Sequence, residues 1–437
     1  MKFNKLTSAL VALGVLSLAA LAQANTTNTV YFTGSTAARS VIYNAAKASG
    51  QIFTNAATVI GGVDSSSSGK IVYQGNLSDG STLILNCSWT GSEAGIAAVA
   101  GQSLTQSANG GTYGIPGVPA SYLTAPYSTA STASATHASD LAMADSSQTV
   151  SLTSKTSYPL AEYGIVGIVP FTTMKGYMAT PTPAWSNIVN VTTAVINQNM
   201  AGPLAANIYT GNTNDAGENV VVCGRNLGSG TRVNSMLSFQ QPVTATVDQF
   251  AFGYYPTATP GVLTFGAATT GGTNYTAAAN ALLEVGNDGF DSGGNVKQSL
   301  QTDGTGAGAL ILGYLGIADA AGAGVAPTSG VGGGAATYLP FNGVYESDSA
   351  VINGTYTYWG QEHLYGTVGQ STSSAAGVAA AAIKSGIVAQ LISSNSGKKT
   401  GAVGPTYTAQ SAVIPTILMQ VKRSTDGGFP AQATYGY

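Results

Sequence analysis

The sequence has 437 residues, of which only 8% are charged, with 15 basic against 18 acidic side chains. This acidic balance excludes a polycation that seeks nucleic acid, so any bound anion must be held by local donors. The chain is too long for a single hydrophobic core, and two or more lobes are expected.

The first 24 residues have the pattern of an export signal peptide. Lys2 and Lys5 precede an apolar run over residues 10–21, and small residues at 22–24 form a cleavage site. Because this run is too short for a membrane span and no later stretch qualifies, we expect a soluble, exported protein. We expect it in the periplasm, with secretion or the cell surface as the alternative. Removal of the signal leaves 13 basic against 18 acidic residues, a net charge of about −5.

Two units of strand, small-residue loop and helix follow the signal. TVYFT at 29–33 predicts a strand, and GSTAAR at 34–39 leads into a helix through about Ala48, with Ser35 or Thr36 as its N-cap. TLILNCSW at 82–89 predicts a second strand, and the next six residues open a helix that begins at Ile96.

The middle of the chain is less regular. Residues 101–138 are rich in Gly, Ser, Thr and Ala without periodicity, which predicts a long loop or insertion. DLAMA at 140–144 leads into Asp145, and the apolar run 163–171 predicts a fully buried strand of a parallel sheet. A helix is expected over 189–200.

Residues 220–239, VVVCGRNLGSGTRVNSMLSF, predict a strand, a glycine-rich turn and a helix start. Gly228 and Gly230 permit close approach of the backbone to a ligand. The N–H groups of residues 229–231 would lie at a helix N-terminus, where unpaired donors and the helix dipole favour an anion. Arg225, four residues before Ser229, adds a guanidinium group. The pattern predicts an anion-binding loop; the alternative is a Gly/Ser turn beside a surface arginine.

The remaining segments extend the alternation of strands and helices. We expect a weakly periodic mixture over 243–304, a buried strand at 307–317, a Gly/Ala connection at 322–334, a helix at 375–392, a strand at 413–421 and no regular structure from KRSTDGG onward. This alternation predicts an α/β fold with a largely parallel sheet. Ligands of such sheets bind at the carboxyl ends of the strands.

Cysteines and histidines are few. Cys87 and Cys223 are the only cysteines, and they form either a disulfide or two buried thiols. Neither His137 nor His363 has a metal-ligand spacing or a neighbouring nucleophile, and no nucleotide-binding loop ending in Gly-Lys-Ser/Thr occurs. We therefore expect no enzymatic activity, cofactor or metal, and a structural role for His363.

Four motifs together resemble the phosphate-binding proteins of ABC importers. These motifs, which occur in the family's order, are GSTAAR at 34–39, TGSEAGI at 90–96, DLAMADSS at 140–147 and RNLGSGT at 225–231. ALILGYLGIADA at 309–320 is similar to a later strand of the family, and the resemblance covers roughly residues 28–395. It implies the type II periplasmic binding protein fold, in which two lobes with mostly parallel sheets flanked by helices enclose a ligand cleft. Lobe 1 would comprise 25–156 plus 341–437, and lobe 2 would comprise 157–340.

The same resemblance implies a set of ligand-binding residues. They are Ser35, Thr36, Ala37, Ser92, Asp145, Arg225, Ser229, Gly230 and Thr231. Hydroxyl and amide groups would donate to the oxyanion and Arg225 would supply charge. Asp145 would require a proton on the ligand and so reject sulfate. The alternative for Asp145 is a helix N-cap.

The partners implied are inorganic phosphate or a similar oxyanion and an ABC permease of the inner membrane, with the binding protein as a monomer. The alternative function is that of a surface or extracellular structural or adhesive protein that keeps the fold.

Three features depart from the family pattern. Glu93 follows the expected ligand Ser92, and its side chain either opposes a bound anion in the cleft or faces solvent at the helix start. The insertion 101–138 separates Ser92 from Asp145, and Arg39 either adds charge to the site or lies on the helix surface. The family fold would also put Cys87 and Cys223 in different lobes, which argues for free thiols because a disulfide would obstruct hinge closure.

Overall fold

A computed structural model describes residues 26–108, 111–115, 120–124, 133–252, 254–256, 262–265, 282–287, 289–326, 333–395 and 413–432. The expected signal peptide and parts of the insertion 101–138 lie outside these residues.

The fold is built on one large mixed sheet of 13 strands. Its order is β16-β13-β12-β18-β10-β20-β9-β1-β4-β3-β2, with β11 paired to β12 and β19 paired to β10. The strands of this sheet are β1 (Thr27–Gly34), β2 (Thr58–Gly62), β3 (Lys70–Asn76), β4 (Thr82–Ser88), β9 (Leu141–Ala144), β10 (Leu160–Lys175), β11 (Leu204–Ala205), β12 (Asn219–Cys223), β13 (Gln249–Phe252), β16 (Leu282–Gly286), β18 (Ala309–Gly316), β19 (Thr337–Leu339) and β20 (Trp359–Thr367).

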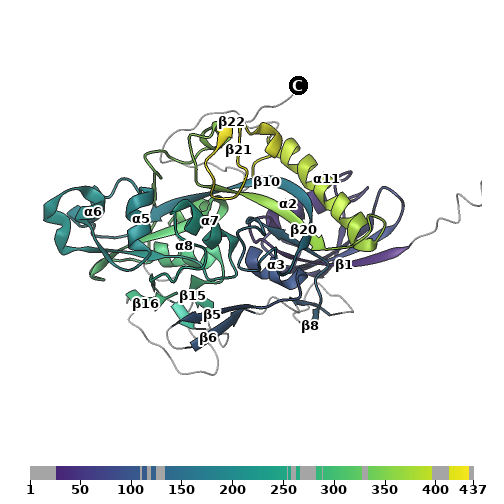
Figure 1. Ribbon diagram of the computed structural model, residues 1–437, viewed down its shortest axis with the longest axis horizontal. Coiled ribbons are helices and arrows are strands. Elements are labelled where there is room, and N and C mark those ends of the chain that lie inside the picture. The colour runs from purple at the N-terminus through teal and green to yellow at the C-terminus, as the bar shows by residue number, and fades with distance from the viewer. Residues whose placement is uncertain are drawn as a thin grey trace, which may run out of the picture.

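The sheet contains two groups of parallel strands. In one group β1 pairs parallel with β4 and β9, and in the other β12 pairs parallel with β13 and β18. The long strands β10 and β20 pair antiparallel from Leu160–Thr367 to Pro170–Trp359 and join the two groups (Figure 1). An α/β fold with parallel strands in each half is thereby confirmed, although the outer strands are antiparallel. The expectation that 163–171 is a fully buried strand of a parallel sheet is wrong, because β10 pairs antiparallel with β18, β19 and β20 and its residues 163–165 are only partly buried. The lobe boundaries at 156/157 and 340/341 stay a prediction.

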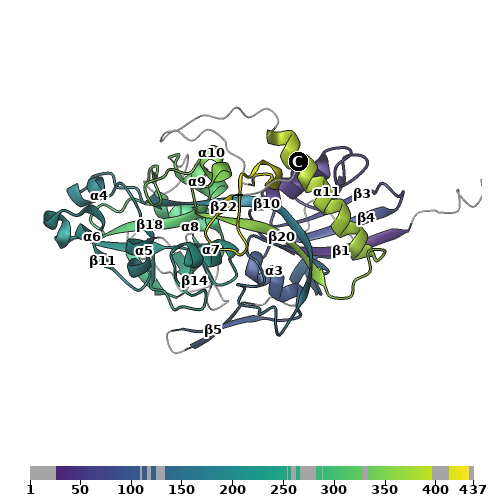
Figure 2. The same ribbon diagram turned by 45° about the horizontal axis from the view of Figure 1, so that its top comes forward.

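Helices cover the faces of this sheet (Figure 2). They are α2 (Arg39–Lys47), α3 (Ser92–Val99), α4 (Pro183–Asn187), α5 (Thr193–Asn199), α6 (Asn207–Thr210), α7 (Gly230–Ser238), α8 (Gly293–Gln301), α9 (Ile317–Ala323), α10 (Asp348–Asn353) and α11 (Ala375–Asn395), with two 3-10 helices, η1 (Thr213–Gly217) and η2 (Thr416–Leu418). Four small sheets remain: β5 (Leu104–Ala108) with β6 (Gly111–Ile115), β7 (Ala120–Leu123) with β8 (Ser134–His137), β14 (Tyr254–Pro256) with β15 (Val262–Phe265) and β17 (Gly289–Phe290), and β21 (Val421–Lys422) with β22 (Ala431–Gln432).

Helix α11 is the one helix in the described part of the chain that is long and apolar enough to cross a membrane, judged by length and composition alone. The expectation that no such segment follows the signal is therefore wrong. Its residues Ala376, Ala379, Ile383, Ile387 and Leu391 are buried at intervals of three or four, and they pack towards α2 and β10. This pattern is that of a helix with one face in the core of a globular protein.

Several local predictions need correction. The N-cap of helix α2 is Ala38, which makes no side-chain hydrogen bond, and not Ser35 or Thr36. The Ser35 hydroxyl instead donates to Glu362. Helix α3 begins at Ser92 rather than at Ile96. The insertion is not a plain loop, since its described residues form the hairpins β5–β6 and β7–β8. The sequence of these strands consists mainly of polar and small residues and therefore has no clear alternation of hydrophobic positions. For this reason the hydrophobic pattern did not predict them.

The expected strand at 413–421 is also wrong. Ile414 bridges to Ile168, a 3-10 turn follows, and only Val421 and Lys422 are in a strand. By contrast, Cys87 and Cys223 are free and buried, as the implied fold predicts.

Candidate functional site

Three junctions between a strand and a helix meet at the carboxyl ends of the parallel strands. Ser35 follows β1 and its backbone N–H donates to the carbonyl of Met143, 2.8 Å away. The N–H of Gly91, before α3, donates to the carbonyl of Gly34 at 2.9 Å. The N–H of Glu93 in α3 donates to the carbonyl of Gly228, before α7, at 3.1 Å. The two halves of the sheet are thus in direct contact here.

Glycine is required at the contact between these junctions. Gly91 has a φ of 97°, and a Cβ at this position would lie 2.4 Å from the carbonyl oxygen of Gly228. Any side chain would push the start of α3 away from the loop before α7.

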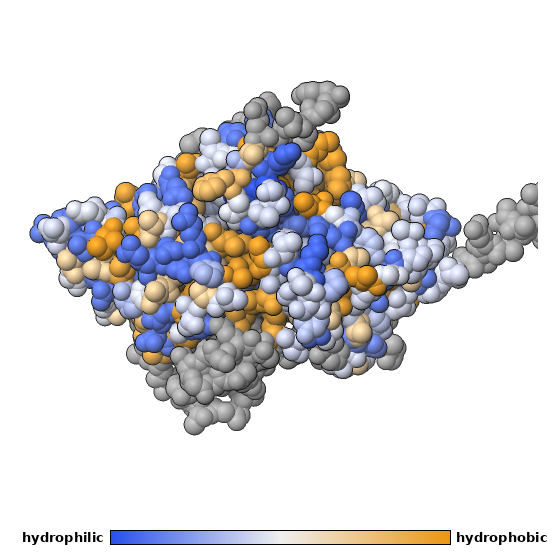
Figure 3. Space-filling view, in the orientation of Figure 1, coloured by the Kyte–Doolittle hydropathy of each residue, from blue (hydrophilic) through white to orange (hydrophobic). Residues whose placement is uncertain are grey.

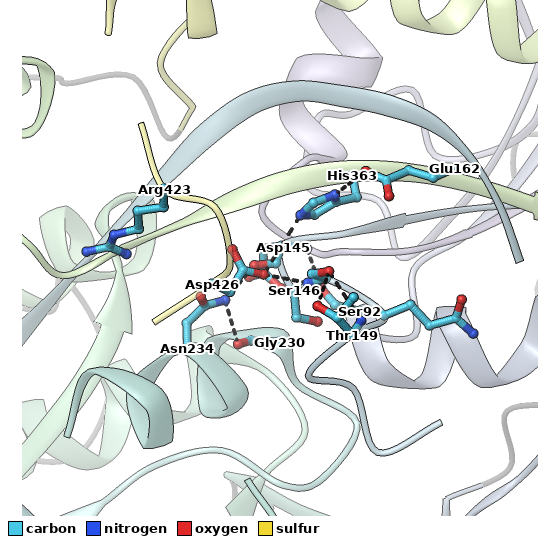
Figure 4. A network of polar contacts seen from close by, with 12 residues as sticks. Ser92, Asp145, Ser146, Thr149, Glu162, Gly230, Asn234, His363, Arg423 and Asp426 are labelled. Carbon is cyan, nitrogen blue, oxygen red and sulfur yellow. Dashed lines mark hydrogen bonds and ion pairs between the residues drawn. The ribbon is translucent and has the colours of Figure 1, made fainter. Parts of the chain in front are cut away.

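Asp145 lies at the centre of the group. Its Oδ1 accepts a hydrogen bond from the Ser92 hydroxyl, which also accepts from the Asp145 N–H at 3.2 Å (Figure 4). A Cβ on Gly230 would lie 1.7 Å from Oδ1, so the carboxyl group reaches the first residue of α7. The Asp145 side chain therefore does not cap a helix that follows it; it lies between α3 and α7.

The protonation of Asp145 is shifted by its surroundings. Burial raises its pKa to about 6, while the hydrogen bond from Ser92 and the charge of Arg225 act in the opposite direction. Near neutral pH this carboxyl group can therefore change its protonation when the local charge changes.

Arg225 is buried, not on the surface. Its Nε donates to the carbonyl of Phe290 at 3.2 Å and its Nη2 to the carbonyl of Asp291 at 2.9 Å. Within the described residues it forms no ion pair shorter than 4.0 Å, although the charges of Asp319, Asp291 and Asp145 act on it and raise its pKa against the effect of burial. Backbone carbonyls thus orient the guanidinium group without neutralising its charge.

The α7 junction has the expected form. Ser229 is the N-cap of α7, and its hydroxyl accepts from the N–H of Arg232 at 3.3 Å. Gly230 and Thr231 are buried in the first turn, with their N–H groups at the end of the helix that favours negative charge. The Asp145 carboxyl group lies at this end.

The first junction is less enclosed. Ser35 is buried, whereas Thr36 and Ala37 are partly exposed in the turn before α2. No hydrogen bond between described residues ties the side chain of Thr36 to Asp145 or Arg225. Arg39 is half-buried, and the charge of Asp319 acts on the pKa values of both Arg39 and Arg225. Arg39 is therefore not fully exposed on the helix surface.

Glu93 adopts neither of the two expected orientations. It is fully buried and accepts hydrogen bonds from the hydroxyls of Ser146 and Ser151, each at 2.6 Å, and from the N–H of Leu152 at 2.9 Å. It orders the segment that follows Asp145, and burial raises its pKa despite these hydrogen bonds.

Sequence reasoning missed a second set of buried charged groups. His363 lies 2.7 Å from Glu162 and 3.8 Å from Asp426, and Asp426 accepts from the N–H of Ser147 at 2.5 Å (Figure 4). Glu362 accepts from the Ser35 hydroxyl at 3.2 Å. The adjacent ionisable residues at 362 and 363, inside a run otherwise suited to a buried strand, are the signal that could have revealed them.

Asp426 belongs to residues 413–432, which we call the C-terminal strap. Arg423 of the strap donates to the carbonyls of Trp359 and Thr357, and its guanidinium carbon lies 3.8 Å from the centroid of the Trp359 ring. A Cβ on Gly427 would lie 2.6 Å from Leu237 of α7. The strap thus contacts β20, α7 and the segment after Asp145 together.

In the space-filling view, hydrophobic residues gather near the middle of the face that presents α7, with hydrophilic residues around them (Figure 3).

The pKa of His363 predicts a measurable dependence of stability on pH. Burial alone lowers this pKa, but the charges of Asp426 and Glu162 raise it to about 9. Because the folded pKa exceeds the unfolded value near 6.5, the stabilisation is complete below that value and lost as pH rises through about 9. From pH 6 to 9.5 we expect the stability advantage of the wild type over His363→Gln to shrink by about 2–3 kcal/mol.

Urea unfolding at both pH values measures this difference. His137→Gln removes the other histidine without touching Glu162 or Asp426 and serves as the control. An advantage of the wild type over His363→Gln that is equal at both pH values would contradict a charged His363 in this network.

No group of three or more His, Cys, Asp or Glu side chains with the arrangement of a metal site occurs among the described residues. The fold and the site thus define an α/β protein in which polar junctions from two groups of parallel strands converge on one buried aspartate.

No family model matches the chain, and no curated protein matches it. Solved structures similar to it include a putative phosphate ABC transporter substrate-binding protein with bound phosphate from Clostridium perfringens, at 16% identity and a TM-score of 0.41, covering 83% of this chain and 93% of that chain. An ABC-type phosphate transport receptor from Vibrio cholerae has 12% identity and a TM-score of 0.39, over 84% of this chain and 97% of that one. PstS from Borrelia burgdorferi has 10% identity and a TM-score of 0.31, over 78% and 88%. Similarity at this level carries no conclusion about the ligand.

Proposed function

We propose that the mature protein is an exported solute-binding protein that holds an oxyanion, most simply phosphate, between the N-termini of α3 and α7. It would deliver this ligand to an ABC permease, as a periplasmic monomer without enzymatic activity. In this proposal lobe 1 comprises 25–156 plus 341–437 and lobe 2 comprises 157–340, and a hinge motion between the lobes admits the ligand.

The observation that carries the proposal is the convergence of Ser92, Asp145 and the start of α7 in one buried place, where the charge of the buried Arg225 acts on Asp145. Arg225 has a charge that no carboxylate pairs with directly in the described part of the chain. The first turn of α7 offers backbone donors and the positive end of its dipole. Asp145 would move from this helix end to accept the proton of a bound monohydrogen oxyanion.

A second candidate function is supported by a different observation. The N–H of Glu93 already donates to the carbonyl of Gly228, and Asp145 already occupies the helix end where an anion would bind. A protein that uses this contact to hold its halves together permanently would be a structural or adhesive protein at the cell surface. Its low charge content is compatible with that role.

Thermal unfolding of the mature protein with and without phosphate distinguishes the two functions. A ligand at one hundred times its dissociation constant stabilises the folded state by about 2.7 kcal/mol. We expect the melting temperature to rise with phosphate and to stay constant with sulfate at equal ionic strength. Equal melting temperatures in all three solutions would favour the structural role.

Asp145→Asn should relax the discrimination against sulfate. An amide can donate to a sulfate oxygen, whereas a carboxylate facing an unprotonated oxygen repels it. We expect sulfate binding to become detectable and the preference for phosphate to fall by about tenfold or more, measured by competition titration. Asp64→Asn, an exposed carboxylate paired with Lys47, is the matched control. Selectivity that stays at the wild-type value would remove Asp145 from the site.

A further inference from the structure

Glu362 is a buried carboxyl group with one unused oxygen. It lies on β20 and is fully buried, and its Oε2 accepts from the hydroxyl of Ser35 at 3.2 Å. Its Oε1 is buried without a hydrogen-bond partner among the residues that the structure describes. An unpaired buried oxygen of this kind is costly unless another group satisfies it.

The charges around Glu362 favour its neutral form. Burial raises its pKa, and the negative charge of Asp145, which follows β9, raises it further. From β10 the residue opposite is Gly167, which has no charge, and no cation of the described chain lies within 4.0 Å of the carboxyl group.

The next residue, His363, is directed to Glu162 of β10 and Asp426 of the strap, so it does not neutralise Glu362. Arg39, in the helix after Ser35, is influenced by the charge of Asp319 and forms no ion pair with Glu362 within the described residues.

A neutral carboxyl group at this position can donate a hydrogen bond to a ligand. In a neutral Glu362 whose Oε2 accepts from the Ser35 hydroxyl, the proton is on Oε1, the oxygen without a partner. Ser35 belongs to the loop that the sequence assigns to ligand binding, and Asp145 lies near enough to influence Glu362 electrostatically. Oε1 is thus a donor without an acceptor beside the proposed site.

We propose that Glu362 is a further ligand-binding residue of this site, which as a neutral carboxylic acid donates its proton from Oε1 to an oxygen of the bound oxyanion. The inference rests on the proposed function and names a new specificity group within it. Glu362 donates a hydrogen bond and Asp145 accepts one, so the pair recognises an oxyanion that has both a bare and a protonated oxygen. Proton exchange with solvent is not required, because each hydrogen stays on its own oxygen.

Calorimetric titration of the mature protein with inorganic phosphate tests this role in two variants. Glu362→Leu keeps much of the volume and removes the donor, and we expect it to bind phosphate about tenfold or more weakly than the wild type at pH 6. Glu362→Gln keeps a donor that does not titrate. As the pH is raised through the pKa of Glu362, we therefore expect the affinity of the wild type to fall relative to that of Glu362→Gln. This ratio cancels the titration of phosphate itself.

Glu284→Gln, an exposed carboxylate on β16, is the matched control for the change of residue type. Wild-type affinity in Glu362→Leu would overturn the inference. Phosphate binding by Glu362→Gln that is tenfold tighter than that of the wild type at pH 6 would also overturn it, because the wild-type Glu362 would then be ionised and would repel the anion. If Glu362→Leu does not fold, as circular dichroism would reveal, Glu362→Met takes its place with the same expected loss of affinity at pH 6, and wild-type affinity in that variant overturns the inference. Absence of phosphate binding by the wild type and Glu284→Gln at every pH would instead contradict the proposed function.

Discussion

Arg225→Ala is expected to weaken phosphate binding by on the order of 2–5 kcal/mol, because it removes the charged partner of a buried anion. The guanidinium group is held by the carbonyls of Phe290 and Asp291, which fix its orientation before any ligand arrives. Its loss would also leave the carboxyl groups of Asp145 and Asp319 without the positive charge that now offsets part of the rise in their pKa values caused by burial. Calorimetric titration at pH 7 gives the change in affinity directly.

Arg225→Lys provides the comparison for this prediction. It keeps the charge but cannot make the two hydrogen bonds to carbonyls in the same geometry, so its affinity should lie between those of the wild type and Arg225→Ala. An unchanged dissociation constant in Arg225→Ala, with the fold intact by circular dichroism, would exclude Arg225 from the site.

Gly230→Ala is expected to lower the free energy of unfolding by about 1–3 kcal/mol and to abolish tight phosphate binding. The added methyl group would lie 1.7 Å from Oδ1 of Asp145 and 2.7 Å from Cβ of Ser92, so either the carboxyl group or the start of α3 must move. Ser92 is held by Asp145 itself, which leaves little room for a small adjustment. Urea unfolding and phosphate titration measure the two effects.

Gly294→Ala is the matched control. Gly294 also lies in the first turn of a helix, α8, but the nearest atom to an added Cβ is the Ser292 hydroxyl at 3.8 Å. There the substitution should be neutral or stabilise the protein by up to about 1 kcal/mol. Equal effects at both positions would show that the Asp145 contact imposes no constraint on residue 230.

The sequence predicted the local structure around the candidate site. Small and hydroxyl residues after apolar strands located the junctions between strand and helix at Ser35, Ser92 and Ser229, and DLAMA at 140–144 contains the strand Leu141–Ala144 that ends before Asp145. Hydrophobic periodicity and turn composition act over neighbouring residues, so they reveal such junctions well.

The parts that were missed depend on contacts between distant segments. Ser35 and Glu362 are separated by 327 positions, and Ser147 and Asp426 by 279. The strap has few apolar residues and contributes through Arg423 and Asp426, whose burial follows from tertiary packing alone. Local composition therefore assigned KRSTDGG to irregular structure, although two of its side chains are buried in the site's surroundings. Glu93 was misjudged for the same reason, since its partners lie in the segment after Asp145.

The central claim is that this site binds an oxyanion, and calorimetric titration of the mature protein tests it most directly. The protein is unfolded and refolded first to remove any ligand that it carries, then titrated at neutral pH with phosphate and, separately, with sulfate. The account predicts saturable phosphate binding with a dissociation constant of about 1 μM or less, which corresponds to about −8 kcal/mol, and no heat of binding with sulfate. No heat of binding with either anion, from protein that has regained its native circular dichroism, would contradict the account and favour a structural role for the closed contact between α3 and α7.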